Sequence, residues 1–100
     1  TGKMIEGRDI TADYWWHNAR GSVRFADGIR SILANLESCD FVEIGPHPVL
    51  KNSIKEVVSE VGAQADTAQT LNRKLPESDT YYSSLGTLHT IGHSPDWEKL

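Results

Sequence analysis

Residues 40–50 read DFVEIGPHPVL, and this stretch decides the fold class of the chain. Its first half carries the aromatic and β-branched bulk that is typical of a buried strand, in Phe41, Val42 and Ile44. Gly45 and Pro46 then end the strand at a tight turn. Pro48 suits the first turn of a following helix, because its missing N–H would have no intrahelical partner there. A strand, a turn and a helix in this order predict an α/β fold whose turn lies at the carboxyl edge of a sheet, where such folds place their sites.

Apolar residues recur at helical spacing on both sides of this strand. The spacing before it predicts an amphipathic helix whose apolar face holds Phe25, Ile29, Ile32, Leu33 and Leu36. The spacing after it predicts a second helix whose apolar face holds Val49 or Leu50, Ile54, Val57, Val58 and Val61. We expect Gly62 to end this helix and residues 66–71 to form an edge strand, which together make a right-handed crossover unit. Gly28, inside the first helix, predicts a close packing contact.

The first twenty residues give weaker signals. Residues 1–10 predict the end of a strand followed by a turn or a short hairpin. A short helix with Thr11 or Asp13 as its N-cap would then carry three consecutive aromatic residues, Tyr14, Trp15 and Trp16. Three such side chains cannot all face one side of a helix, so at least one is expected at a subdomain boundary.

The composition shifts after Leu71. Residues 72–78 are typical of a linker, and Ser78 or Asp79 could cap a last helix that carries Tyr82, Leu85 and Leu88 or His89 on one face. Two glycines, Gly86 and Gly92, weaken that helix. The tail has too few apolar residues to fold alone, so we expect it to dock on another part of the protein.

Length and charge exclude several classes of protein. One hundred residues form at most one small domain, and a chain that begins at Thr1 without Met is expected to be a fragment. Fourteen acidic against ten basic residues give a net charge of −4, and without a Lys/Arg cluster we expect no nucleic-acid partner. No apolar run reaches the ~18 residues of a membrane span, and no signal peptide is evident. The single cysteine, Cys39, predicts a small buried hydrophobe in a reducing, cytoplasmic protein.

Residues 92–96 (GHSPD) begin like the Gly-x-Ser-x-Gly nucleophile elbow of serine hydrolases and acyltransferases. Two physical facts argue against that interpretation. Asp96 stands where the tight turn needs glycine, and Pro95 has no N–H to contribute to an oxyanion hole. We therefore interpret these residues as a Ser-Pro turn.

The remaining candidates for chemistry are histidines and charged residues. His89 and His93 have the i, i+4 spacing of metal ligands, but no carboxylate or cysteine is spaced to complete a site. His47 lies at a predicted helix N-terminus, where a neutral hydrogen-bonding ring or a structural hydrogen bond across the turn would fit. Three arginines could hold a carboxylate or phosphate or could be ordinary exposed residues, namely Arg20, Arg24 and Arg30. Glu43 is a candidate to pair with a neighbouring arginine.

Three motifs in a fixed order carry a resemblance to a known family: residues 13–18 (DYWWHN), 21–25 (GSVRF) and 41–50 (FVEIGPHPVL). They resemble the Tyr-Trp-x-x-Asn, Pro-Val-Arg-Phe and Phe-x-Glu-x-Gly-Pro-His-Pro-x-Leu elements of the acyltransferase domain of type I polyketide synthases. Ser22 departs from the family's usual proline, which affects only the stiffness of the loop. The resemblance implies an α/β fold, the C-terminal part of an α/β-hydrolase-like acyltransferase subdomain with the order helix, helix, strand, helix, strand. The tail is similar to the helical linker that follows this domain.

The resemblance also implies a reaction. The family moves a malonyl-type group from coenzyme A to an enzyme serine, and then to the phosphopantetheine thiol of an acyl carrier protein. The serine, the histidine base and the arginine that holds the malonyl carboxylate belong to segments upstream of Thr1, so the isolated chain is expected to be inactive and to bind no cofactor or metal. Asn18 matches the position whose backbone carbonyl orients the catalytic histidine. His47 and Gly45 match a motif near the mouth of the site and receive structural roles.

The resemblance further implies domains and partners. Residues 1–63 would be the C-terminal segment of the acyltransferase domain, and residues 64–100 its end and the post-acyltransferase linker. The implied partners are the acyl carrier protein and the adjacent ketosynthase and linker domains in cis. One alternative is the malonyl/acetyltransferase of a type I fatty acid synthase, which the flanking domains would distinguish. An alternative of another class is a non-catalytic docking module in which the Trp-rich segment and the tail bind a partner.

Overall fold

The computed structural model describes residues 2–100. Along the chain it contains η1 (Gly7–Asp9), α1 (Ala12–Arg20), α2 (Phe25–Asn35), β1 (Phe41–Glu43), α3 (Lys51–Val61), β2 (Thr67–Gln69), α4 (Glu77–Thr90) and η2 (Trp97–Lys99). The expected order of helix, helix, strand, helix, strand and a helical tail is therefore confirmed. Within residues 2–100, no helix is both long and apolar enough to cross a membrane.

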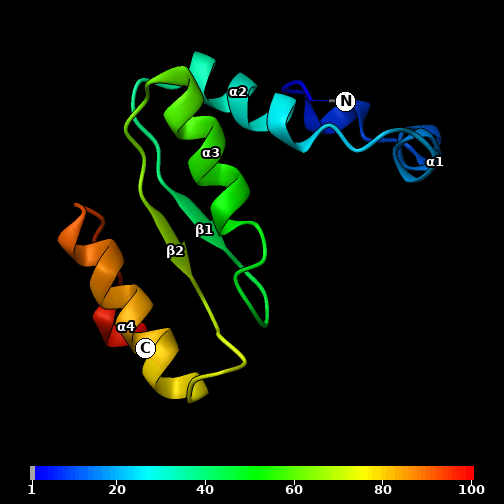
Figure 1. Ribbon diagram of the computed structural model, residues 1–100. Coiled ribbons are helices and arrows are strands. Elements are labelled where there is room, and N and C mark those ends of the chain that lie inside the picture. The colour runs from blue at the N-terminus through cyan, green and yellow to red at the C-terminus, as the bar shows by residue number, and fades with distance from the viewer. Residues whose placement is uncertain (1) are drawn as a thin grey trace.

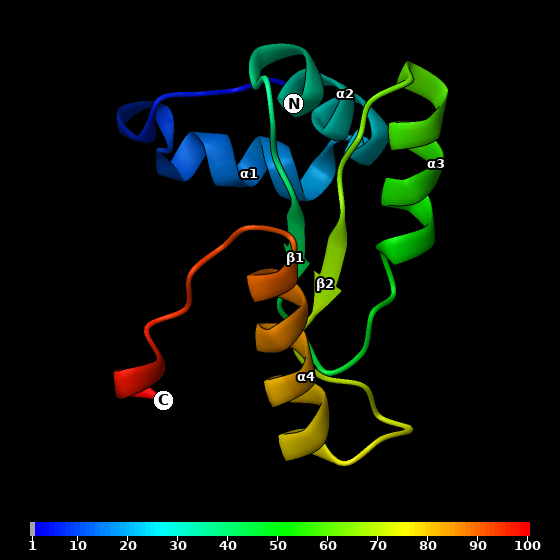
Figure 2. The same ribbon diagram turned by 90° about the vertical axis from the view of Figure 1, so that its left-hand side faces the viewer.

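The centre of the fold is a two-stranded parallel sheet. Phe41 of β1 lies opposite Thr67 of β2, and Glu43 lies opposite Gln69. The chain crosses from β1 to β2 through α3, as the crossover prediction requires. Helices α3 and α4 flank the sheet on opposite sides (Figures 1 and 2), so the strands form the middle layer of a three-layer α/β/α arrangement.

The buried core lies where α2 and α3 meet the sheet. Its buried members are the helical-spacing residues Ile29, Ile54, Val57 and Val58. Partly buried apolar residues surround them, among them Phe25, Leu33, Phe41, Ala63 and Ala65. The two amphipathic faces predicted from the sequence therefore pack against each other, which is how helices of this length gain most of their stability.

Two predicted helix boundaries are confirmed by hydrogen bonds. Thr11, rather than Asp13, is the N-cap of α1, and its Oγ1 accepts a hydrogen bond of 3.2 Å from the Tyr14 amide. Gly62 ends α3 in the left-handed conformation with a φ of 70°, and its N–H points back at the Ser59 and Val58 carbonyls.

Burial was predicted for a strand running from Phe41 to Ile44, and it was wrong for two of these residues. Val42 is 44% exposed and Ile44 is 86% exposed, and the strand ends at Glu43. Alternate side chains of a strand point to opposite faces. Phe41 and Glu43 point toward α3, so Val42 points toward α4, where it lines a groove with Leu85 and Leu88.

Several other local predictions were wrong. Helix α3 begins at Lys51 rather than Pro48, and α4 begins after Pro76 without the side-chain cap expected from Ser78 or Asp79. A Cβ at Gly28 would meet no atom within 4 Å, so this glycine marks no close contact. Residues 2–10 form a 3-10 turn and no strand, and Thr1 lies outside the described residues.

Candidate functional site

The candidate site is the turn between β1 and α3, at the carboxyl edge of the sheet. Glu43, at the end of β1, has its carboxylate at the entry of α3. Its Oε1 accepts hydrogen bonds from the Val49 amide at 2.9 Å and the Leu50 amide at 3.1 Å. Since Leu50 caps α3 without a side-chain bond of its own, the Glu43 carboxylate supplies the acceptor that the helix start lacks. The predicted pairing of Glu43 with an arginine is therefore replaced by a cap.

Thr70 fastens the same turn to the neighbouring strand. Its Oγ1 accepts a 3.0 Å hydrogen bond from the Gly45 amide and lies 3.2 Å from the Glu43 and Gly45 carbonyl oxygens, one of which its hydroxyl can donate to. Its own amide donates to the Glu43 carbonyl at 3.1 Å. Sequence reasoning missed Thr70. The signal that could have found it is the parallel register, which places a polar residue after β2 beside the turn after β1.

His47 lies in this turn and is half-buried. Its Nδ1 is buried and has no hydrogen-bond partner within residues 2–100, so the hydrogen bond that we expected across the turn is not made by this atom. The Val49 amide donates instead to the His47 backbone carbonyl at 3.0 Å. Gly45 has no positive φ, and a Cβ there would meet no atom within 4 Å. The geometry of this chain therefore gives no steric reason for glycine at position 45.

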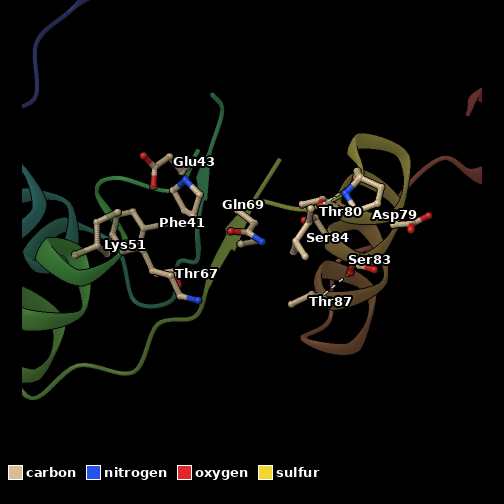
Figure 3. A pocket seen from close by; sticks show the side chains of 15 residues that line it. Phe41, Glu43, Lys51, Thr67, Gln69, Asp79, Thr80, Ser83, Ser84 and Thr87 are labelled. Atoms are coloured by element: carbon tan, nitrogen blue, oxygen red, sulfur yellow. Dashed lines mark hydrogen bonds between the residues drawn. The ribbon is translucent and has the colours of Figure 1, made fainter. Parts of the chain in front are cut away.

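A cavity of about 350 Å³ opens beside the turn, between α3, the sheet and α4. Figure 3 shows Phe41, Glu43 and Lys51 on one side and the polar side chains of α4 on the other, with Thr67 and Gln69 between them. The α4 wall is rich in hydroxyl groups, from Thr80, Ser83, Ser84 and Thr87. No histidine lines this cavity, so neither serine has an imidazole base of the kind that activates a serine nucleophile.

Asn18 lies elsewhere in the molecule, in the last turn of α1. In the part of the chain that the structure describes, no group donates a hydrogen bond to the Asn18 carbonyl, whereas the preceding carbonyl of His17 accepts from the Gly21 amide at 2.8 Å. Asn18 borders a different hollow, which it shares with Tyr14 and Gly21. Helix α1 and the β1–α3 turn are far apart in both views (Figures 1 and 2), so the structure does not bring Asn18 and His47 together.

The three candidate arginines all have partners within the chain. The Arg20 guanidinium lies 5.0 Å from the Trp16 ring centroid. Arg24 pairs with Asp27 at 2.8 Å, and Arg30 pairs with Asp27 and with Glu60 on α3. Hydrogen bonding and charge from Arg24, with a smaller part from Arg30, lower the pKa of the Asp27 carboxyl. Glu60 in turn raises the pKa of Arg30. Of the three, only Arg30 joins two helices, α2 and α3, and Arg24 also borders the hollow beside Asn18.

The histidines of the tail also have protein partners. His89 packs edge-on against Trp97 with ring centroids 5.9 Å apart, and His93 lies 2.8 Å from Asp40. Within residues 2–100, no group of three or more metal-ligating side chains is assembled. Cys39, predicted as a small buried hydrophobe, is half-buried and free.

Comparison with known proteins identifies the family. The acyl transferase domain family matches residues 1–95. The chain is 35% identical over its whole length to the spectinabilin polyketide synthase system protein NorA' of Streptomyces orinoci, and 31% identical over 96% of its length to the erythronolide synthase EryA2 of Saccharopolyspora erythraea. It spans 3% of the length of each of these relatives.

A fungal protein and a solved structure agree with these matches. The highly reducing polyketide synthase anuA of Penicillium roqueforti is 33% identical over the whole chain, which spans 5% of its length. The crystal structure of the acyltransferase domain from module 8 of the salinomycin polyketide synthase superposes with a TM-score of 0.83 at 37% identity, over 94% of this chain and 22% of that one. The chain therefore belongs to the acyl transferase domain family and corresponds to part of such a domain, related to those of polyketide synthases.

Proposed function

We propose that this chain is the supporting part of a polyketide synthase acyltransferase. That enzyme would move a malonyl-type extender unit from coenzyme A to a serine, and then to the phosphopantetheine thiol of an acyl carrier protein. The observation that carries the proposal is the match in both sequence and fold to the salinomycin acyltransferase domain over 94% of the chain. No serine of the described cavity has a histidine beside it, which favours a nucleophile supplied by another part of the domain.

In this proposal Asn18 orients the catalytic imidazole through its backbone. A histidine base needs an acceptor for its second ring nitrogen, because that hydrogen bond fixes its tautomer and orientation. The Asn18 carbonyl suits this role, since it lies at a helix end and accepts no hydrogen bond within residues 2–100. The proline that the family usually carries in place of Ser22 would serve the same end. Proline has no N–H, so it could not close the i to i−4 hydrogen bond onto Asn18.

His47 and Gly45 have supporting roles in this proposal. Glu43 and Thr70 fix the turn between β1 and α3 from two sides, through the helix entry and through β2. The turn is thereby held rigid at the carboxyl edge of the sheet, where α/β folds place their substrates. The Nδ1 of His47 is buried and has no partner within residues 2–100, so it would receive a hydrogen bond from another part of the domain.

We further propose how the chain is divided and what it contacts. Residues 1–63 would belong to the acyltransferase domain proper. Residues 64–100 would contain the end of the domain, including its last strand, β2, and the post-acyltransferase linker. The relatives are polyketide synthases many times longer than this chain, which supports contacts with a carrier protein, a ketosynthase and linker domains of the same polypeptide.

The test uses labelled malonyl-coenzyme A. We expect the isolated chain to retain no covalent label, and the complete acyltransferase domain to form a stable acyl-serine. Within the complete domain, Asn18→Ala keeps the carbonyl and should leave the acylation rate nearly unchanged, as should Ser22→Pro. A covalent acyl group on the isolated chain would overturn the proposal, and so would a large loss of rate in Asn18→Ala without loss of folding.

A further inference from the structure

Asp40 joins three segments that are far apart in the sequence. It immediately precedes β1, and its Oδ1 accepts a 2.8 Å hydrogen bond from the amide of Asp66, the residue before β2. Its other oxygen, Oδ2, lies 2.8 Å from Nε2 of His93, in the turn after α4. The Asp40 side chain is largely shielded, with 19% of its surface exposed. One carboxylate therefore connects the amino edge of the sheet to the C-terminal segment.

The turn after α4 is built so that His93 reaches Asp40. Gly92 adopts a φ of 107°, a conformation that side chains rarely tolerate, and its amide donates to the His89 carbonyl. The His93 amide then donates to the Leu88 carbonyl at 3.0 Å, which closes the helix end in the manner of a Schellman motif. The sequence GHSP, which has no part in the proposed chemistry, thus has a structural use: its glycine turns the chain back toward the sheet.

The contact between Asp40 and His93 links the C-terminal segment, residues 77–100, to the rest of the molecule through polar side chains. Within residues 2–100 it is the one side-chain hydrogen bond between residues 77–100 and residues 2–75. Beside it lies an apolar groove between β1 and α4, lined by Val42, Leu85, Leu88 and Pro95. Loss of the link would leave the segment held by apolar contacts and by the burial of Thr80, whose hydroxyl bonds to the carbonyl of Pro76, the residue just before the segment.

We propose that Asp40 is a latch that holds α4 and the residues after it against the sheet through His93. Other titratable groups in this region have different roles. The Asp66 amide donates to Oδ1 of Asp40, and the Asp66 side chain is exposed. His89 faces Trp97. Opening of the latch would free the turn at residues 91–95 and uncover the groove beside Val42. This inference does not depend on the proposed catalytic function.

Hydrogen exchange in the full-length polypeptide tests the latch. In His93→Ala, we expect the amides of residues 88–93 to exchange about two- to fivefold faster, as for loss of a half-exposed side-chain contact. The amides of β2 should keep their rates. Asp40→Ala should have the same effect on the turn and should also accelerate the Asp66 amide, which loses its acceptor. His93→Gln, whose amide can still donate to Asp40, should restore part of the protection.

A matched pair elsewhere in the chain provides the control. Asp13 and His17 form an exposed contact of 3.4 Å within α1, so Asp13→Ala and His17→Ala repeat the same chemistry where no segments are joined. Neither should change exchange in residues 88–93. The proposal is overturned if His93→Ala behaves like His17→Ala. It is also overturned if His93→Ala accelerates β2 as much as the turn, because that result shows general destabilisation rather than release of one segment.

Discussion

The α2–α3 region and residues 2–23 differ in how much apolar surface they bury. Helices α2 and α3 bury Ile29, Ile54, Val57 and Val58 against each other and the sheet, and Arg30 joins them through Glu60. Residues 2–23 bury no side chain, although they include Trp15 at 57% and Trp16 at 58% exposure. Both regions form helices with an apolar side. The difference shows that an amphipathic pattern stabilises a fold only where a second apolar surface is present to meet it.

The prediction with the largest expected effect compares one side-chain truncation in each of these two regions. Ile54→Ala removes a buried side chain from the α2–α3 core and should reduce the free energy of unfolding by about 2–4 kcal/mol. Trp15→Ala removes a larger but exposed side chain, and should change the stability of this chain by less than about 0.5 kcal/mol. Urea unfolding followed by circular dichroism measures both.

The same two substitutions can be made in the complete acyltransferase domain. If the exposed tryptophans face another part of the acyltransferase, Trp15→Ala should there cost several times more than in the isolated chain, whereas the cost of Ile54→Ala should be similar in both. An equally small effect in both contexts would favour the docking-module alternative, in which the aromatic segment stays free for a partner.

A smaller effect is expected at the turn between β1 and α3, where the Glu43 carboxylate accepts hydrogen bonds from the first amides of the helix entry. Glu43→Ala removes the acceptor for the Val49 and Leu50 amides and should cost about 0.5–2 kcal/mol, the usual range for loss of a helix cap. Glu43→Gln keeps one acceptor oxygen and should cost less. Glu56→Ala, on the exposed side of α3, is the matched control and should be close to neutral. If Glu43→Ala and Glu56→Ala are equal, the cap does not stabilise α3.

Two glycines of the α2–α3 region should respond with opposite sign. Gly28→Ala places a methyl group where no atom lies within 4 Å and should stabilise α2 by about 0.5–1 kcal/mol. Gly62→Ala must hold a φ of 70° and should destabilise α3 by about 1 kcal/mol. Thermal melts of the two variants compare them directly. Destabilisation by Gly28→Ala would show a packing contact that this structure lacks.

The smallest expected effect is on the pH dependence of stability. The hydrogen bond from the Asp66 amide, followed by that from His93, holds the pKa of the Asp40 carboxyl below its ordinary value of 3.8. A carboxyl whose pKa is lower in the folded than in the unfolded state stabilises the fold at pH values above 3.8, its ordinary pKa. This stabilisation is lost as the pH falls through the folded-state pKa. Wild type should therefore lose stability below about pH 4 more steeply than Asp40→Asn, which cannot titrate. Parallel melting curves between pH 2 and pH 6 would contradict this.

Local sequence patterns predicted the parts of the fold that depend on near neighbours. Helices α2 and α3 follow from apolar residues three and four apart, the cap at Thr11 from its own hydroxyl, and the end of α3 from the freedom of Gly62. Asn18 was singled out by family resemblance and His47 by its place at a predicted helix start as well, and the structure places them in separate regions. The roles assigned to them stay predictions.

Three hydrogen-bonded contacts that sequence reasoning missed depend on the tertiary structure. Glu43 was expected to pair with an arginine, but its carboxylate accepts hydrogen bonds from the amides of Val49 and Leu50 at the entry of α3. Thr70 meets Gly45 across 25 positions, and His93 meets Asp40 across 53. No local pattern indicates such partners, because each depends on strand register or on where α4 docks.

The sequence by itself determined the family, the order of helices and strands and the apolar faces that build the core, because these depend on motifs and on spacing along the chain. Only the tertiary structure decided which face of β1 is exposed, what the Glu43 carboxylate binds and how the tail is attached. A side chain in a strand alternates by position, but its burial depends on which elements cover each face of the sheet. For this chain, α3 covers Phe41 and Glu43, while Ile44, the residue after β1, is exposed.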